Sequence, residues 1–276
     1  MSLSVEVAGP RRESSNPFLA DLLGSLRHPE FWAYSSWLDI ITKYRRTRLG
    51  LVWLVLPTAM YLVVLGNVYS HLMNYPLEKY LPYLALGYVS WRFMIQCIND
   101  STNVFRSHKG FIMDGRLQLT DFTLRAVCRP LVYLGFAFLV VIAVLAWSPS
   151  VHWANLLSLF VTLPVLILNV IWISFCISLV GARFPDIGEV IHTVLVVGFL
   201  LTPILWHIEK FPPGTLRGLL ARLNPAFHLI EFVRAPVLGH MPERTTLAAM
   251  ALLTLGGWLL AMFLYRRYAR FVPLWI

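Results

Sequence analysis

Charged residues are scarce in this chain, and the scarcity narrows the class of protein. Only 13% of the 276 residues are charged and 58% are apolar, and the mean hydropathy is +0.66. An ordinary soluble domain is about half apolar and about a quarter charged. This balance excludes a soluble domain of ordinary composition and indicates a chain that lives in a bilayer.

Catalytic and metal-binding motifs are missing as well. The sequence contains no G-x-x-x-x-G-K-[ST] phosphate loop, no G-x-S-x-G and no H-E-x-x-H. Its eight histidines are scattered singly, and Cys97, Cys128 and Cys176 lie in apolar segments without metal-ligand spacing. We therefore expect no enzyme activity, no metal site and no bound cofactor in this chain.

The first residues, MSLSVEVAGPRRESSNPF, have no apolar core of the signal-peptide type. We expect residues 1–28 to form a flexible cytoplasmic N-terminus and the membrane spans themselves to direct insertion. The net charge of +9 would suggest a nucleic-acid ligand in a soluble protein. In a membrane protein, Lys and Arg clustered on one side of the spans are a simpler explanation, so we expect no nucleic-acid partner.

Six stretches are apolar enough to be transmembrane helices, each of which needs about 20 predominantly apolar residues. The candidate spans are residues 51–72, 80–105, 124–147, 152–182, 189–206 and 246–265. The sequence therefore predicts an all-α integral membrane protein with a six-span domain over residues 49–276. Pro203 should end or kink the fifth span, because its ring clashes with the preceding helical turn.

An even number of spans places both chain ends on the same side of the membrane. If that side is the cytoplasm, sixteen of the 23 Lys and Arg residues fall on inside segments and six fall outside, with Arg92 in mid-span. Because cytoplasmic loops carry an excess of Lys and Arg, both termini are predicted to be cytoplasmic.

Two further segments look helical but cannot span. Residues 29–48 carry aromatic and apolar side chains at three- and four-residue steps and end in a basic cluster, which predicts an amphipathic helix in the membrane interface. An ordinary soluble helix is the alternative. Between spans five and six, LRGLLARL and AFHLIEFVRAPVL predict two short helices that are re-entrant or lie on the periplasmic face. A simple extracellular loop is the alternative there.

Several of these segments, taken in order, resemble one family. KYRRTRLGLVWLVLP, LALGYVSWRFM, GARFPDIGEVIHTVLVVGFLLTPILW and LNPAFHLIEFVRAPVLG are similar to successive motifs of the ABC-2 type permeases that export polysaccharide. The matches extend over residues 40 to 270 with the expected spacing. Each motif is weak by itself, but the ordered set is specific.

The resemblance implies a channel-forming transmembrane subunit of a bacterial inner-membrane ABC exporter. Such a subunit forms a homodimer and pairs with two copies of a separate ATPase subunit, which uses the ATP. The implied substrate is a lipid-linked polysaccharide, with O-antigen or lipopolysaccharide first and capsule or teichoic acid next. A small-molecule exporter of the same permease class remains an alternative, as does an ion-coupled secondary transporter, although the chain has no internal repeat. An integral-membrane glycolipid transferase is a third alternative.

The resemblance also assigns roles to residues. In the family, the interface helix and the loop between spans two and three contact the ATPase. The coupling residues implied here are Arg45, Arg46, Arg48, Phe111, Met113, Asp114 and Arg116. The three arginines also lie where anionic lipids attract cations. Glu231 and Arg234 match a family E-x-x-R pattern, and an exposed pair at this spacing contributes under ~1 kcal/mol. We therefore interpret them as an outer gate.

The second span carries a stripe of polar side chains on one helical face. The stripe consists of Tyr88, Arg92, Gln96, Asn99 and Asn103, with Trp91 at its margin. An arginine facing lipid in mid-span would cost about 2.5 to 3.5 kcal/mol, so the stripe must face protein or water. It forms either a hydrogen-bonded seam against neighbouring helices or part of the glycan path. In a path, Arg92 would meet the diphosphate of the lipid carrier, and Tyr88 and Trp91 would offer stacking surfaces.

Overall fold

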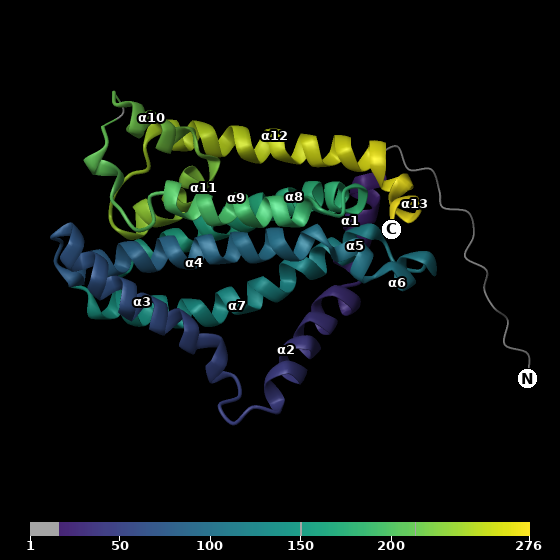
Figure 1. Cartoon of the computed structure of the whole chain (residues 1–276), viewed down its shortest axis with the longest axis horizontal. Helices are drawn as coiled ribbons and strands as arrows, with labels where there is room; N and C mark the ends of the chain where they lie inside the picture. The colour runs from purple at the N-terminus through teal and green to yellow at the C-terminus, as the bar shows by residue number, and fades with distance from the viewer. Residues whose placement is uncertain (1–16, 150, 213) are drawn as a thin grey trace, which may run out of the picture.

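The computed structural model describes residues 17–149, 151–212 and 214–276, and these contain helices and no strand. The long helices form one bundle, and most of them run along the long axis of the molecule (Figure 1). They are α3 (Val52–Met73), α4 (Leu77–Thr102), α7 (Leu119–Trp147), α8 (Leu159–Arg183), α9 (Ile187–Leu201) and α12 (Arg244–Tyr268). Each of them covers most of one predicted span.

Among the described residues, four helical segments are long and apolar enough to cross a membrane. They are Val52–Met73, Leu119–Trp147, Trp153–Arg183 and Arg244–Trp275. Helix α9 is apolar, but its 15 residues extend only about 22 Å, against about 30 Å for the hydrocarbon core of a bilayer. Helix α4 is long enough at 26 residues, but it is more polar and lies at the centre of the bundle. Length and composition thus support four of the six predicted spans.

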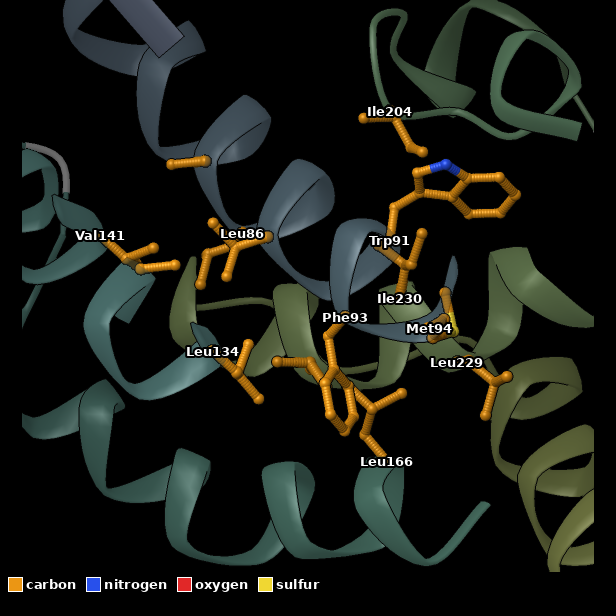
Figure 2. Close-up of a cluster of buried hydrophobic side chains, with 14 of the residues drawn as sticks. Leu86, Trp91, Phe93, Met94, Leu134, Val141, Leu166, Ile204, Leu229 and Ile230 are labelled. Atoms are coloured by element: carbon orange, nitrogen blue, oxygen red, sulfur yellow. The ribbon is translucent and has the colours of Figure 1, made fainter. Parts of the chain in front are cut away.

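Helix α4 is central because most of its side chains are buried against α3, α7, α8, α9 and α11 (Pro225–Val237). Figure 2 shows side chains of α4 meeting those of the neighbouring helices. Leu86 and Phe93 of α4 lie in one cluster with Leu134 of α7, Leu166 of α8 and Leu229 of α11. Close packing of these apolar side chains supplies the van der Waals contacts that hold helices together in a bilayer.

A glycine sets the closest approach in the bundle. A Cβ atom at Gly181 would lie 1.9 Å from the backbone oxygen of Thr102, so only glycine lets α8 pass this close to the end of α4. The space that a side chain would need is filled by backbone, which cannot give way as a flexible side chain can. Helices α4 and α8 are therefore held in direct contact near their C-terminal ends. We label the end of the bundle where α4 terminates the inner end and the opposite end the outer end.

The N-terminal prediction is wrong for residues 17–27, which form helix α1 (Pro17–Arg27), while residues 1–16 lie outside the described residues. Phe18 is fully buried among aromatic rings that include Phe175 and Tyr265. The Tyr265 hydroxyl donates a hydrogen bond of 2.8 Å to Asp21. These partners lie far away in the sequence, so they could not be inferred from the polar composition of the N-terminal segment, which alone suggested a flexible chain.

The predicted helix over residues 29–48 is present as a π-helical turn, η1 (Glu30–Tyr34), followed by α2 (Ser35–Arg45). Helix α2 leaves the bundle at an angle, and a short turn leads into α3 (Figure 1). Ser36 and Ile40 are buried on the inner face of α2, while Trp37 and Leu38 are about 40% exposed on the other. One face of α2 thus packs on the protein and an apolar face stays free.

The fifth helix ends where Pro203 predicts. Helix α9 stops at Leu201, and Thr202 follows in an extended conformation. The segment up to α12 contains η3 (Ile208–Lys210), α10 (Leu216–Leu223) and α11, so the two predicted short helices exist and the segment is not a simple loop. The remaining elements are short. They are α5 (Val104–Ser107), α6 (Lys109–Met113), η2 (Trp153–Ser158), η4 (Ala269–Phe271) and α13 (Val272–Trp275).

Candidate functional site

The polar stripe of α4 is the face of this helix that is least completely buried. Tyr88, Arg92, Gln96 and Asn99 are half-buried and Asn103 is exposed, whereas most other side chains between positions 80 and 102 are buried. The helical spacing therefore identified a real face of α4. That face meets different neighbours along its length.

The outer half of the stripe packs against α3. The Tyr88 ring stacks on Tyr61, with centroids 3.9 Å apart and planes 11° from parallel. Arg92 donates a 2.9 Å hydrogen bond to the hydroxyl of Thr58, which is fully buried. Beside Gln96 and Arg92 the protein encloses only about 10 Å³, which is no more than one water molecule requires. Here the arrangement is a seam between helices.

The inner half of the stripe opens into a cavity. Asn99 and Asn103 line a space of about 300 Å³ between α2, α4, α5 and α7. We name this the inner cavity. Its lining also carries charged and polar side chains, which are Ser36, Asp39, Asp100, Ser107, His108, Arg125 and Arg129. A polar cavity of this size can hold water, so this part of the stripe is not a dry seam.

Two ion pairs connect the elements around the inner cavity. Arg125 of α7 donates to Asp39 of α2 at 2.7 Å, and Arg129 of α7 donates to Asp100 of α4 at 2.8 Å. Arg125 also donates to Nε2 of His108 at 3.0 Å, while Nδ1 of His108 lies 2.8 Å from the backbone oxygen of Val104. A ring that accepts at one nitrogen and donates at the other is neutral. Burial also lowers the pKa of His108, which favours this neutral state.

Trp91 does not lie with Tyr88 and Arg92. Its indole is 95% buried and packs towards α9, with the Phe199 ring 6.1 Å away. Figure 2 shows the indole beside Ile204. Nε1 of Trp91 has no hydrogen-bond partner within the described part of the chain. The structure thus separates this residue from the stripe to which the sequence assigned it.

The predicted coupling residues are all exposed, but they fall into two groups. Phe111 and Met113 are about half exposed on α6, and Asp114 and Arg116 follow them. The Phe111 ring lies 6.1 Å from that of Phe31 in η1. The predicted arginines at positions 45, 46 and 48 stand at the turn between α2 and α3, which lies away from α6 in Figure 1. The start of the helical segment over residues 29–48, not its basic end, meets the α6 region.

At the outer end, Glu231 and Arg234 form the predicted ion pair, with the guanidinium donating two hydrogen bonds to one carboxylate oxygen. The expectation of an exposed pair is wrong, because Arg234 is only 1% exposed. Its Nη1 donates to the backbone oxygen of Pro203 at 2.8 Å, and its guanidinium lies 3.7 Å from the ring centroid of Tyr83. A buried cation with this many partners fixes the structure around it.

Sequence reasoning missed two tyrosines that complete this arrangement. The hydroxyl of Tyr80 donates to the backbone oxygen of Leu205 at 2.8 Å, and that of Tyr83 lies 3.1 Å from the oxygen of Pro203 and 3.0 Å from that of Trp206. Together with Arg234 they hold the segment that follows α9. We name Tyr80, Tyr83 and Arg234 the outer lock. Tyr80 and Tyr83 stand three residues apart, and this spacing on one face of α4 was the signal in the sequence. Tyrosines near the end of a span are common, however, because they also lie at membrane interfaces.

A second outer ion pair joins α10 to the start of α12. Arg222 donates to both carboxylate oxygens of Glu243, at 3.0 and 2.8 Å. These hydrogen bonds lower the pKa of the Glu243 carboxyl. Beside this region, α9 and α10 border an apolar groove of about 920 Å³. No group of three or more His, Cys, Asp or Glu suited to a metal ion occurs in residues 17–149, 151–212 and 214–276.

These features define a polytopic helical membrane protein. Its helices are apolar enough to span a bilayer, its central helix has a polar face, and charged networks lie at both ends of the bundle. The family model for the ABC-2 type transporter matches residues 32–238, so this chain belongs to that family. The resemblance seen in the sequence motifs is thereby confirmed.

Relatives with assigned roles cover most of the chain. The polysialic acid transport protein KpsM of Escherichia coli is 24% identical over 232 residues, which is 83% of this chain and 89% of KpsM. The O-antigen export system permease protein RfbA of Myxococcus xanthus is 18% identical over 222 residues, which is 77% of this chain and 82% of RfbA. Membership of this family agrees with a transport subunit rather than an ATPase or another enzyme.

Proposed function

We propose that this chain is the channel-forming membrane subunit of an ATP-driven exporter of lipid-linked polysaccharide. The observation that carries the proposal is that permeases named for polysialic acid and O-antigen transport align with over three quarters of the chain. O-antigen or lipopolysaccharide is the first candidate substrate, and capsule or teichoic acid is the next. A small-molecule exporter of the same family is the alternative, which the names of these relatives disfavour.

The proposed membrane arrangement has six crossings, made by α3, α4, α7, α8, α9 and α12, within a domain over residues 49–276. Both termini are cytoplasmic, and residues 29–48 form the interface helix. The free apolar face of α2 supports the interface position. Helix α9 is too short to cross the bilayer alone, but the segment after it is held against the protein by the outer lock. Irregular chain is tolerated at membrane depth when it is buried in protein, so this segment supports a crossing that α9 begins and the segment completes.

The proposed assembly is a homodimer with two copies of an ABC ATPase subunit, which uses the ATP; this chain binds no cofactor. Exposed apolar side chains cover α9, including Val194, Val197, Leu200 and Leu201, and the described helix has no buried residue. This surface suits contact with lipid or a second subunit. The exposed phenylalanine and charged residues of the α6 region suit the ATPase contact.

The proposed substrate path uses the inner part of the α4 stripe. Asn99 and Asn103 offer neutral hydrogen-bonding groups in the inner cavity, and such groups suit the hydroxyls of a sugar. Tyr88 and Arg92 belong to the same proposed path but are occupied by Tyr61 and Thr58 in this conformation. For them to meet a glycan and its diphosphate, α3 would have to move away from α4.

The test is loss of export in cells that lack the protein. Deleting the gene should abolish surface polysaccharide, with lipid-linked glycan accumulating inside, and complementation should restore the surface polymer. Purified full-length protein should also copurify with an ATPase subunit. Reversing Arg45, Arg46 and Arg48 to Glu should remove an attraction to anionic lipid of about 1 kcal/mol per residue. Because these arginines are also proposed to contact the ATPase, the reversal should weaken that copurification.

The matched control for the coupling test is the reversal of Arg266 and Arg267, which are also exposed and basic but end α12. Normal surface polysaccharide in the deletion strain would refute the export function. Copurification of the ATPase at the wild-type level with the triple reversal would refute the coupling role alone and leave these arginines with a role in topology.

A further inference from the structure

A broad groove lies between the exposed face of α9 and helix α10. It has a volume of about 920 Å³, and its walls include Val194, Val197, Leu200 and Leu201 of α9 and Leu220 of α10. These side chains are at least half exposed, so the described part of the chain does not cover them. We name this the α9–α10 groove. A contiguous apolar surface that the protein leaves open marks a site for another molecule.

The apolar wall of the groove follows α9 towards the outer end. Helix α9 begins next to Thr102, at the C-terminal end of α4, and ends before the segment that the outer lock holds. From Val194 to Leu201 the helix rises about 10 Å. The hydrocarbon of one leaflet is about 15 Å thick, which is half of a core of about 30 Å. At the membrane position proposed for α9, this wall therefore lies at the depth of the lipid chains of the outer leaflet.

Beyond the end of α9 the lining of the groove is basic. It includes Lys210 of η3 and Arg217 of α10, and its described residues include no Asp or Glu. Both cations are exposed, and neither forms an ion pair within residues 17–149, 151–212 and 214–276. The Nζ atom of Lys210 lies 3.4 Å from the backbone oxygen of Met73 and 5.4 Å from the centroid of the Tyr75 ring. The groove therefore offers positive charge that no carboxylate of its described lining balances.

An aromatic side chain stands between the apolar and the basic parts of the groove. The Nε1 atom of Trp206 donates a 3.1 Å hydrogen bond to the backbone oxygen of Leu200, and its ring meets the Phe211 ring edge-on with centroids 5.1 Å apart. Tryptophan is enriched at membrane–water interfaces, and Lys and Arg attract anionic headgroups there. Apolar, aromatic and basic groups thus follow one another in the order in which an outer-leaflet lipid presents its chains, its glycerol backbone and its headgroup.

A second copy of the chain fits this groove less well than a lipid does. A twofold interface brings the same patch of both subunits together, so the residues of the patch must complement one another. Two facing grooves would gather Lys210 and Arg217 of both copies without a carboxylate from the described lining, although the core of a protein interface is depleted in charge. An anionic lipid avoids this conflict, because its headgroup pairs with the cations and its chain covers the apolar wall.

We propose that the α9–α10 groove is a binding site for an anionic phospholipid of the outer leaflet, of the phosphatidylglycerol type. One acyl chain lies along Val194, Val197 and Leu201, and the phosphate lies between Lys210 and Arg217. The lipid is a resident of the site and not the exported molecule, so the inference goes beyond the proposed function and depends only on the membrane position of α9. The bound lipid completes the outer-leaflet surface where α9 is too short to cross alone.

The test uses the full-length protein in nanodiscs made of equal amounts of phosphatidylglycerol and phosphatidylcholine. In one sample the phosphatidylglycerol carries a photoreactive diazirine on an acyl chain, and in the other the phosphatidylcholine carries it. After illumination, peptide mass spectrometry should find at least fivefold more cross-links to residues 193–201 from phosphatidylglycerol than from phosphatidylcholine. Helix α12, whose Leu252 and Leu255 are about 70% exposed, should be labelled equally by the two lipids.

Two variants address the two parts of the site. Lys210→Gln combined with Arg217→Gln removes the headgroup partners, so the enrichment should fall below twofold. Val197→Trp fills the groove with a larger apolar side chain and should reduce labelling of residues 193–201 by both lipids. The matched control is Lys79→Gln combined with Arg244→Gln, which removes two exposed cations from the same end of the molecule outside the groove. This control should keep the wild-type enrichment.

Equal labelling of residues 193–201 by the two lipids in the wild type would refute the site, as would wild-type enrichment in the double variant of Lys210 and Arg217. If inorganic phosphate abolishes the enrichment at an ionic strength matched with chloride, the cations bind a free anion and the lipid site fails. If neither lipid labels α9 and cross-links between two copies of the chain map to the groove, a second copy covers it and the proposal fails. The wild-type comparison needs no variant, so poor folding of a variant leaves the proposal testable.

Discussion

Arg234 at the outer end and Arg129 at the inner end each pair with a carboxylate, yet their side chains are 1% and 43% exposed. At the outer end, Arg234 is surrounded by protein groups that it also binds, namely the Tyr83 ring and a backbone oxygen. Inside, the ion pairs line a cavity of about 300 Å³. The same type of ion pair is thus buried in packed protein at the outer end and partly exposed beside a cavity at the inner end.

The difference predicts unequal resistance to change. Removing one partner of a buried ion pair leaves an uncompensated charge and costs about 3 to 5 kcal/mol. Removing a partner from an exposed pair costs about 1 kcal/mol or less, because water replaces it. The outer end should therefore be rigid, and the inner end should rearrange at little cost. An inner end of this kind suits contact with a moving partner.

The largest effect should come from Glu231→Gln, which leaves Arg234 buried without its carboxylate. We expect the free energy of unfolding to fall by about 3 to 5 kcal/mol, seen as a lower melting temperature in detergent or reduced levels in the membrane. The control is Glu209→Gln, which removes an exposed carboxylate from the same region. Equal melting temperatures for the two variants would abolish the distinction between the ends.

A smaller loss is expected for Tyr80→Phe. The hydroxyl of Tyr80 donates a hydrogen bond to the Leu205 oxygen, and the residue is fully buried. The variant should lose about 1 to 3 kcal/mol, because a buried carbonyl is left without its donor. Tyr34→Phe, at a site that is 63% exposed, should change the melting temperature little. A wild-type melting temperature for Tyr80→Phe would mean that this part of the outer lock contributes nothing.

The Arg222–Glu243 pair should make the stability of the outer end depend on pH, with a smaller effect than that of Tyr80→Phe. Hydrogen bonds from Arg222 lower the folded-state pKa of Glu243, so the pair contributes stability above the unfolded pKa of about 4.3 and loses it as the pH falls through the folded pKa. Because Glu243 is 40% exposed, the contribution should stay under ~1 kcal/mol. In melting curves from pH 6 to pH 3, Glu243→Gln should show a shallower loss of stability. Parallel curves for the variant and the wild type would contradict the assignment.

The smallest effect on stability is expected at the inner end. Asp39→Asn removes the partner of Arg125 at a site where the carboxylate side chain is 46% exposed, so the melting temperature should hardly change. The same variant removes one of the contacts that hold α2 against α7, and the amount of copurified ATPase should fall. A large loss of stability would show that the inner end is as rigid as the outer one and would contradict the difference between the two ends.

Much of the fold could be predicted because it depends on local patterns. Apolar runs located the helices, and Pro203 marked the end of α9 because a proline acts on its own turn. The pairing of Glu231 with Arg234 followed from a spacing of three residues. The burial of that pair did not follow, because Tyr83 and Pro203 approach it from distant parts of the chain.

The candidate site shows the same limit. Helical spacing placed Tyr88 through Asn103 on one face of α4, but it could not say that α3 covers one half and a cavity borders the other. Helical spacing also put Trp91 at the margin of this face, but its indole packs towards α9. Which neighbour covers a helical face is a tertiary property, and no single segment encodes it.

The contact between α1 and α12 has a consequence for the order of events during synthesis. Tyr265, the hydrogen-bond partner of Asp21, is synthesised 244 residues after it. At about 5 to 20 residues per second, a ribosome needs roughly 12 to 50 s to cover that distance. Phe18 must wait for a similar interval before its aromatic neighbours Trp258 and Tyr265 of α12 exist. Full docking of α1 therefore follows the synthesis of α12, and a ribosome that stalls before α12 leaves α1 without these partners.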